Sequence, residues 1–171
     1  MPCFRPPCLA VVNQVPCVRT RRTRTTSYLV DINVWLALSW GSHPHSATAW
    51  KWFRALGQGE VLYCRLTQIG LLRLITTKAI MGDDCLTVRK AWGVYDQWLR
   101  DPKVGFRHEP AEVDSLFRRA TAQFSHTPAP KALGDCYLLA LAASLHATLV
   151  TLDGGLSAMA DRLKLDAVLL Q

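Results

Sequence analysis

Hydrophobic and polar positions follow a regular pattern from residue 28 to the end of the chain. Short apolar runs predict strands at 28–31, 61–64, 104–106, 147–152 and 167–170. Between these runs, apolar side chains spaced three or four apart predict amphipathic helices. Because strands alternate with helices and no hairpin turn joins neighbouring strands, we expect an α/β fold, a three-layer α/β/α sandwich with a mainly parallel central sheet.

The predicted helices begin and end at typical capping and breaking residues. They occupy residues 33–39, 49–56, 67–76, 88–99, 113–124 and 134–143, and a further short helix follows 154–155. Gly57 ends the second helix, and Thr67 is the predicted N-cap of the third. A turn is expected at 82–84. The helix that starts near Gly134 is apolar on nearly every side, which is typical of a helix in the middle of a fold.

Basic residues are concentrated at the start of the chain. The 171 residues include 20 Lys and Arg against 13 Asp and Glu, a formal net charge of +7, and five Arg but no acid lie within residues 1–27. This segment has neither a helical nor a strand period, and no apolar core of secretory length. We therefore expect a basic leader without regular structure at 1–27 and a single domain at 28–171. The alternative is that the leader is an arm that binds phosphates of a nucleic acid.

Composition indicates a soluble globular protein of the cytoplasm. Half of the residues are hydrophobic and 19% are charged, enough to form a core. The longest apolar stretches, such as 137–143, are far shorter than the ~20 residues that cross a bilayer, so no membrane association is expected. The six Cys include no Cys-x-x-Cys pair, which favours free thiols in a reducing compartment. His43 and His45 are typical of a polar turn, and binding of a metal by the pair is the alternative.

Three acids are predicted to meet at one edge of the sheet. Asp31 and Asp153 directly follow predicted strands, and Asp135 lies in the first turn of the apolar helix. Parallel sheets bind ligands beyond the carboxyl ends of their strands. Each acid alone is explained by a helix cap or a turn, but three converging carboxylates repel one another and call for a cation. Ligation by oxygen alone favours Mg²⁺ or Mn²⁺, whose bound water can act as a nucleophile.

Four segments carry most of this chemistry. They read YLVDINVWLAL at 28–38, CRLTQIGLLRLIT at 64–76, GDCYLLALA at 134–142 and TLVTLDGG at 148–155. In this order and at this spacing they resemble the PIN-domain ribonucleases, specifically the VapC-type toxins of bacterial type II toxin–antitoxin systems. The resemblance spans residues 28–171.

The resemblance implies a metal-dependent endoribonuclease that uses Mg²⁺ or Mn²⁺. Asp31 is then the principal metal ligand and Asn33 orients it or the substrate. Asp135 is a second metal ligand, and Asp153 completes the acidic cluster directly or through a water. Thr151 is implied to form a hydrogen bond within the site. A water activated by the metal cleaves an RNA phosphodiester and leaves 5′-phosphate and 3′-hydroxyl ends.

Gln68 is a departure from the family pattern. Many PIN domains have a Glu at this place, whereas here the segment reads Leu-Thr-Gln-Ile-Gly. An amide oxygen can bind a metal's water but brings no charge, so we expect one tightly held metal rather than two. Gln68 stays among the candidate catalytic residues.

The family also implies a protein partner. VapC-type toxins are silenced by a VapB-like antitoxin whose tail fills the acidic groove, so a homodimer or a toxin–antitoxin hetero-oligomer is expected. Outlying bases such as Arg65, Arg73 and Lys131 are candidates to offset the acids.

Two other functions are weighed against this one. A haloacid-dehalogenase-type phosphatase has a strand that ends in Asp, but it needs a second Asp at the position of Asn33. A catalytically weak PIN-like module that binds RNA or protein is favoured by Gln68 and by the presence of only three Glu. The three acids retained together speak against that module.

Overall fold

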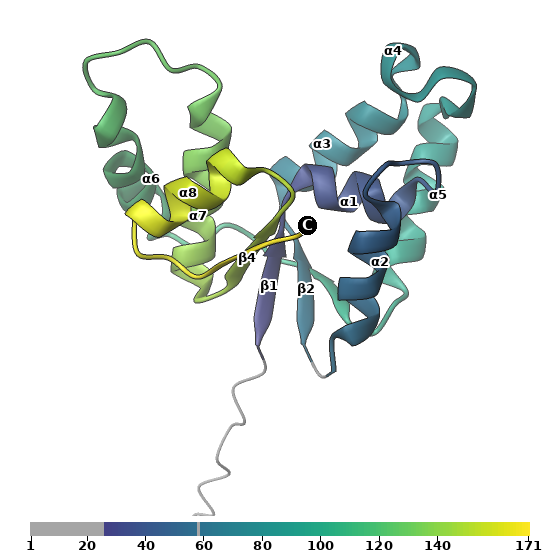
Figure 1. Cartoon of the computed structure of the whole chain (residues 1–171), viewed down its shortest axis with the longest axis horizontal. Helices are drawn as coiled ribbons and strands as arrows, with labels where there is room; N and C mark the ends of the chain where they lie inside the picture. Colours follow the sequence, from purple (N-terminus) through teal and green to yellow (C-terminus); the bar gives the residue numbers. More distant parts are fainter. Residues whose placement is uncertain (1–25, 58) are drawn as a thin grey trace, which may run out of the picture.

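Five parallel strands form the central sheet (Figure 1). A computed structural model describes residues 26–57 and 59–171, so the predicted basic leader falls almost entirely outside the described residues. In spatial order the strands are β3 (Val104–Phe106), β2 (Glu60–Tyr63), β1 (Ser27–Val30), β4 (Thr148–Thr151) and β5 (Ala167–Leu169). The parallel arrangement confirms the predicted α/β class, and each strand overlaps its predicted run.

The helices agree with the apolar pattern in number and order, apart from one extra turn. They are α1 (Ile32–Ser39), α2 (Ser46–Ala55), α3 (Arg65–Ile75), α4 (Lys78–Met81), α5 (Val88–Leu99), α6 (Val113–Thr121), α7 (Ala132–Leu145) and α8 (Gly154–Arg162). Short 3₁₀ turns follow at η1 (Gly82–Asp84) and η2 (Ala122–Phe124). The short helix α4 lies in a segment for which the sequence pattern predicts no element.

The predicted N-cap of α3 is wrong by three residues. The helix begins at Arg65 and Cys64 occupies the N-cap, not Thr67. The Thr67 hydroxyl nevertheless caps the helix, because it accepts a hydrogen bond from the backbone N–H of Cys64 at 3.1 Å. A hydroxyl at the third helical position can reach back to the N-cap in this way. Thr67 therefore does cap the helix, but from the third helical position and not from the N-cap.

Helices cover both faces of the sheet. Successive strand residues point to opposite faces, so Val30 and Tyr63 join the core formed with α1, α2, α3 and α5, while Leu29 and Leu62 join the core formed with α6, α7 and α8. Figure 1 shows these two groups of helices on opposite sides of the strands. The three-layer α/β/α sandwich is therefore confirmed.

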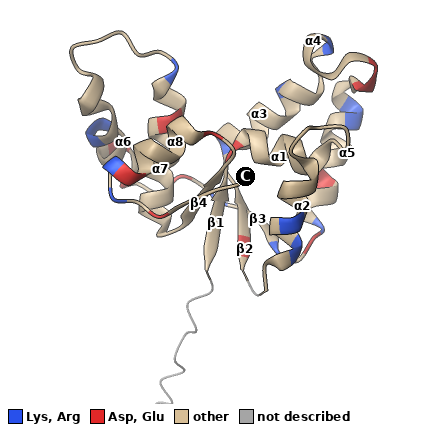
Figure 2. Cartoon of the chain, in the orientation of Figure 1, with Lys and Arg blue, Asp and Glu red and all other residues tan. Residues whose placement is uncertain are grey.

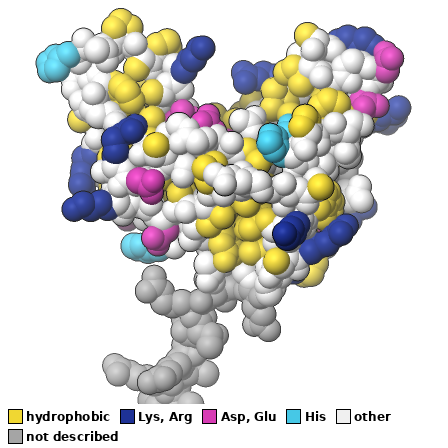
Figure 3. All heavy atoms as spheres, viewed as in Figure 1, with side chains coloured by type: hydrophobic (Ala, Val, Ile, Leu, Met, Phe, Trp, Pro, Cys, Tyr) yellow, Lys and Arg dark blue, Asp and Glu magenta, His cyan; other side chains and the backbone are white. Residues whose placement is uncertain are grey.

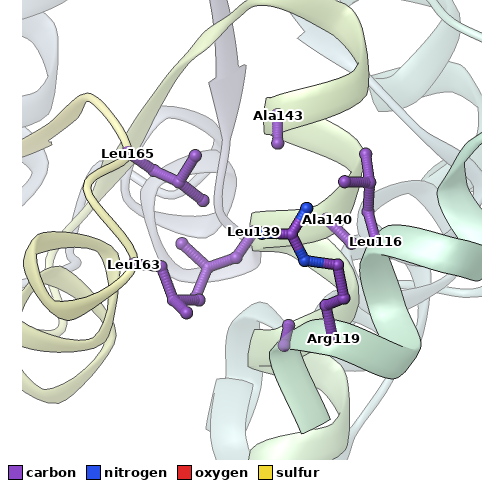
Figure 4. Close-up of a pocket in the computed structure, with 8 residues that line it drawn as sticks. Leu116, Arg119, Leu139, Ala140, Ala143, Leu163 and Leu165 are labelled. Atoms are coloured by element: carbon purple, nitrogen blue, oxygen red, sulfur yellow. The ribbon is translucent and has the colours of Figure 1, made fainter. Parts of the chain in front are cut away.

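A small apolar pocket lies within the second group of helices (Figure 4). It has a volume of about 170 Å³ and lies between α6, α7 and the segment that follows α8, with Leu116, Leu139 and Leu163 in its lining and the Arg119 side chain beside them. Its α7 residues come more than one turn after Asp135. The lining of this pocket includes none of the three candidate acids.

The strand order changes direction between β1 and β4. From β1 the chain moves outward to β2 and β3 on one side, then crosses over to β4 and β5 on the other. Ligands of open parallel sheets bind at such a switch point. The pairing of β1 with β4 continues past the strand, since the backbone N–H of Asp31 donates to the carbonyl of Val150 at 2.9 Å.

The helices in the described part of the chain are too short or too polar to span a membrane.

Candidate active site

Asp31 lies where β1 ends and α1 begins. The strand is buried at Leu29 and Val30, and Asp31 then takes an extended backbone conformation as the N-cap of α1. Its Oδ1 accepts a hydrogen bond from the backbone N–H of Ile32 at 2.6 Å. Asp31 is only 6% exposed. Its carboxylate is therefore fixed at the carboxyl edge of the sheet with little access to water.

Thr151 connects Asp31 to the segment that follows β4. It is the last residue of β4 and is fully buried. Its hydroxyl donates to Oδ2 of Asp31 at 3.0 Å and accepts from the backbone N–H of Asp153 at 2.9 Å. Both oxygens of Asp31 thus accept a hydrogen bond, and the turn that carries Asp153 is held against β4.

Asp153 is the N-cap of α8. Its Oδ1 accepts hydrogen bonds from the backbone N–H groups of Gly155 at 2.7 Å and Leu156 at 3.3 Å. The side chain is exposed, and the positive end of the helix dipole favours a carboxylate at this position. Asp153 therefore has a structural role as a cap that does not depend on any chemistry at the site.

Asp135 approaches the same edge from α7. It lies in the first turn of the helix and is half-buried. Burial and then the charge of Asp153 raise its pKa. Figure 2 shows acidic positions on the segments after β1 and β4 and on α7, around the space between the two groups of helices, and the space-filling view in Figure 3 shows acidic side chains in the notch between them.

The electrostatics of Asp31 show that the three acids act on one another. Burial raises the pKa of Asp31 from 3.8 to about 6, hydrogen bonds from Thr151 and Ile32 oppose the rise, and the charges of Asp135 and Asp153 add to it. No ion pair within residues 26–57 and 59–171 includes any of these acids. A negative charge is therefore held in a buried position without a balancing base, which is the condition a cation would relieve.

The donor set fits a hydrated magnesium or manganese ion better than a closed cage. Across the described ranges, no three His, Cys, Asp or Glu side chains are gathered tightly enough to hold a metal ion by themselves. Mg²⁺ keeps several of its waters and commonly uses only one or two carboxylates. Asp31 with Asp135 offers that number, and Asp153 is placed to act through a water.

Comparison with known proteins gives the family. The PIN-domain family model matches residues 28–162. This chain belongs to the PIN-domain family. It is 35% identical over 130 residues to ribonuclease VapC41 of Mycobacterium tuberculosis, an alignment that covers 73% of this chain and 88% of that relative. The resemblance inferred from the four sequence segments is therefore confirmed.

Solved structures of VapC proteins share the fold of this PIN domain. VapC20 of Mycobacterium tuberculosis, described as a Sarcin-Ricin loop cleaving toxin, superposes with a TM-score of 0.56 at 19% identity over 77% of this chain and 93% of its own. VapBC2 from Rickettsia felis, bound to a DNA fragment from its promoter, gives a TM-score of 0.62 at 12% identity over 85% of this chain and 100% of its own. At these sequence identities the similarity concerns the fold alone.

The two remaining candidate residues of the PIN domain differ in their surroundings. Asn33 is exposed in the first turn of α1, two residues after Asp31. Gln68 is 5% exposed on α3, and its Oε1 accepts a hydrogen bond from Nη1 of Arg65. The Gln68 carbonyl oxygen is therefore engaged with a base rather than with the acids. Sequence reasoning placed Arg65 only among outlying bases, because nothing in the local pattern shows which side chain a Gln will contact.

Proposed function

We propose that this chain is the toxin of a type II toxin–antitoxin pair and acts as a Mg²⁺- or Mn²⁺-dependent endoribonuclease in the cytoplasm. The observation that carries the proposal is the mutual influence of Asp31, Asp135 and Asp153 near the switch point of the sheet, where no ion pair within residues 26–57 and 59–171 includes any of them. The names of the curated relatives, which are ribonucleases, support the reaction class.

The chain's own residues would hold the ion and keep it in place. When bound, a divalent cation supplies an activated water and neutralises charge on the phosphate. Asp31 and Asp135 ligate it, and Asp153 completes the site directly or through a water. Thr151 keeps Asp31 in position through the hydrogen bond to Oδ2, and Asn33 orients Asp31 or the substrate. Hydrolysis breaks the bond from phosphorus to the ribose 3′-oxygen and leaves 5′-phosphate and 3′-hydroxyl ends.

A VapB-like antitoxin is the proposed partner, in a hetero-oligomer that also joins toxin copies. The acidic edge attracts a basic side chain, because a cation from a protein relieves the buried charge of Asp31 as a metal does. The VapBC2 complex of Rickettsia felis has the same fold and supports this assembly.

Cleavage of structured RNA by the full chain tests the activity. We expect products in Mg²⁺ or Mn²⁺, none in a chelator, and a loss of at least about a hundredfold in Asp31→Asn and Asp135→Asn, as is typical when a group that holds the catalytic centre is removed. Asp161→Asn is the matched control, because Asp161 is an exposed acid near the far end of α8. Cleavage that survives chelation or both active-site substitutions would overturn the mechanism.

The alternative of a weak binding module makes a different prediction in the same assay. It is favoured by Gln68, which brings no charge to the site. A module of this kind binds the RNA but yields no cut products with either metal. The family match leaves the phosphatase alternative without support.

A further inference from the structure

Arg65 lies just past the end of β2, the strand that pairs with β1. β1 and β2 pair with Leu29 opposite Leu62, and extending this register by two residues brings Cys64 opposite Asp31. Arg65 follows as the first residue of α3 and is exposed. The Arg65 backbone therefore lies at the same carboxyl edge of the sheet as Asp31, on the side of β2 and β3.

Two neighbours, Gln68 and Phe106, contact the Arg65 side chain. Its Nη1 donates to Oε1 of Gln68, and its Cζ lies 5.0 Å from the centre of the Phe106 ring at the end of β3. Burial raises the pKa of Tyr95 on α5, and the positive charge of Arg65 opposes that rise, which places the guanidinium near the phenol as well. A long side chain ordered before binding loses less rotamer freedom when a ligand arrives.

No acid in the described part of the chain forms an ion pair with Arg65. The first turn of α3 also has no acidic residue. A cation at the start of a helix also meets the unfavourable end of the helix dipole. Arg65 is thus an ordered, exposed positive charge at a position where it does little for stability, just past the end of the strand that pairs with β1.

We propose that Arg65 binds a phosphate of the RNA backbone adjacent to the site of cleavage, and that Gln68 and Phe106 position it. This inference rests on the proposed function. Gln68 accepts a single hydrogen bond from the guanidinium, and most of the five N–H donors of an arginine remain for phosphate oxygens.

The proposal also gives a physical reason for Gln in place of Glu. A carboxylate at residue 68 would pair with Arg65 and cancel its charge, whereas the neutral amide orients the guanidinium and leaves the charge available. Gln68 is thus assigned as a positioning residue for Arg65 instead of a metal ligand.

The test measures RNA binding without cleavage. The full chain carrying Asp31→Asn is kept in chelator, and its affinity for a fluorescently labelled RNA stem–loop is recorded over a range of salt concentrations. Adding Arg65→Gln is expected to weaken binding about tenfold at low salt and to reduce the slope of log affinity against log salt by about 0.7 to 1, the contribution of one phosphate contact. Gln68→Glu should give the same two changes.

Arg54→Gln is the matched control. Arg54 also lies over an aromatic ring, with Cζ 5.3 Å from the centre of the Trp50 ring, but it is next to the end of α2, from which the chain passes to the amino end of β2. Its affinity and salt slope should equal those of the parent, and thermal melts should show all variants folded.

The two proposals fail in different ways. If the parent binds RNA and Arg65→Gln leaves its salt slope unchanged, the role of Arg65 is overturned, including the case in which the substitution weakens only a complex with an antitoxin. If the parent does not bind RNA and the wild-type chain does not cleave it, the proposed function itself fails.

Discussion

The Thr151 hydroxyl joins the two central strands of the sheet through Asp31, whose Oδ2 accepts its hydrogen bond at 3.0 Å. The same hydroxyl accepts from the backbone N–H of Asp153. Because Thr151 is fully buried and Asp31 nearly so, water cannot substitute for either contact. One side chain therefore fixes the carboxylate after β1 and the turn after β4 together.

Thr151→Val should weaken the proposed metal site while it keeps the shape of the side chain. The Thr151 hydrogen bond lowers the pKa of Asp31, so its loss should raise that pKa further above about 6. Since a carboxylate must be ionised to hold a metal, the acidic limb of the pH profile of cleavage should move to higher pH, with the largest loss near neutrality.

Thr151→Ser is the control for this change, because it retains the hydroxyl and should retain the wild-type profile. Stability should fall by about 1–3 kcal/mol in the Val variant, since the N–H of Asp153 loses its acceptor. A Val variant whose pH profile overlays that of the wild type would contradict the assigned role of the hydroxyl.

Asp31→Asn should stabilise the protein at high pH while it abolishes cleavage. Burial raises the pKa of Asp31 from 3.8 to about 6, so the folded state holds its proton more tightly than the unfolded state does. The contribution of Asp31 to the free energy of unfolding is then complete below about pH 4 and falls as the pH rises through about 6. The difference between the two ends of this range is about 3 kcal/mol.

Urea unfolding of wild type and Asp31→Asn, in chelator at pH 4.5 and pH 8, measures this difference. Between pH 4.5 and pH 8, the free energy of unfolding of Asp31→Asn should rise relative to that of the wild type. That of Asp161→Asn should not. A gap between wild type and variant that stays the same at both pH values would show that Asp31 does not carry the raised pKa.

Magnesium should restore the stability that the buried charge removes. A ligand that binds only the folded state stabilises it by about 2.7 kcal/mol at a hundred times its dissociation constant. At pH 8 the wild type should therefore gain in Tm when Mg²⁺ replaces chelator, and both Asp31→Asn and Asp135→Asn should lose most of that gain. Equal gains in all three proteins would place the bound metal elsewhere.

Strand ends explain how much of the site could be inferred from the sequence. Asp31 and Asp153 each follow an apolar run, and parallel strands bring their carboxyl ends to a common edge, so the edge could be assigned from local patterns alone. The strand order could not, because the lengths of the crossovers do not determine on which side of β1 the chain continues. The switch point between β1 and β4 is therefore known only from the structure.

Long-range contacts explain what the sequence could not show. Gln68 and Arg65 are three residues apart on α3, but the ring that supports the guanidinium comes from Phe106, which reaches it only because β3 pairs with β2. The sequence pattern correctly predicts both strands and gives no information on which of them are neighbours. The same limit explains why Gln68 could be interpreted only by its position relative to a family pattern.

Deletion of residues 1–25 should leave a folded chain with wild-type cleavage. All of the proposed catalytic residues lie between 31 and 153, and the carbonyl of Thr26 accepts a hydrogen bond from the N–H of Glu60 at 3.0 Å, so the deletion must stop before Thr26. Circular dichroism, Tm and the RNA cleavage rate measure the outcome. A drop in cleavage with an unchanged Tm would instead assign the basic leader to phosphate binding.

Asp153 allows its role as a helix cap to be separated from a role in chemistry. Asn caps helices as well as Asp does, whereas Ala removes the cap at a cost of about 1 kcal/mol. Asp153→Asn should therefore keep the hydrogen bonds to Gly155 and Leu156 and the stability of the wild type, and Asp153→Ala should lose both. Cleavage should fall about ten- to a hundredfold in both variants, as is typical when a group next to a metal ligand is lost, because both lack the charge. If Asp153→Asn cleaves RNA at the wild-type rate, Asp153 is a cap alone, and the metal site reduces to Asp31 and Asp135.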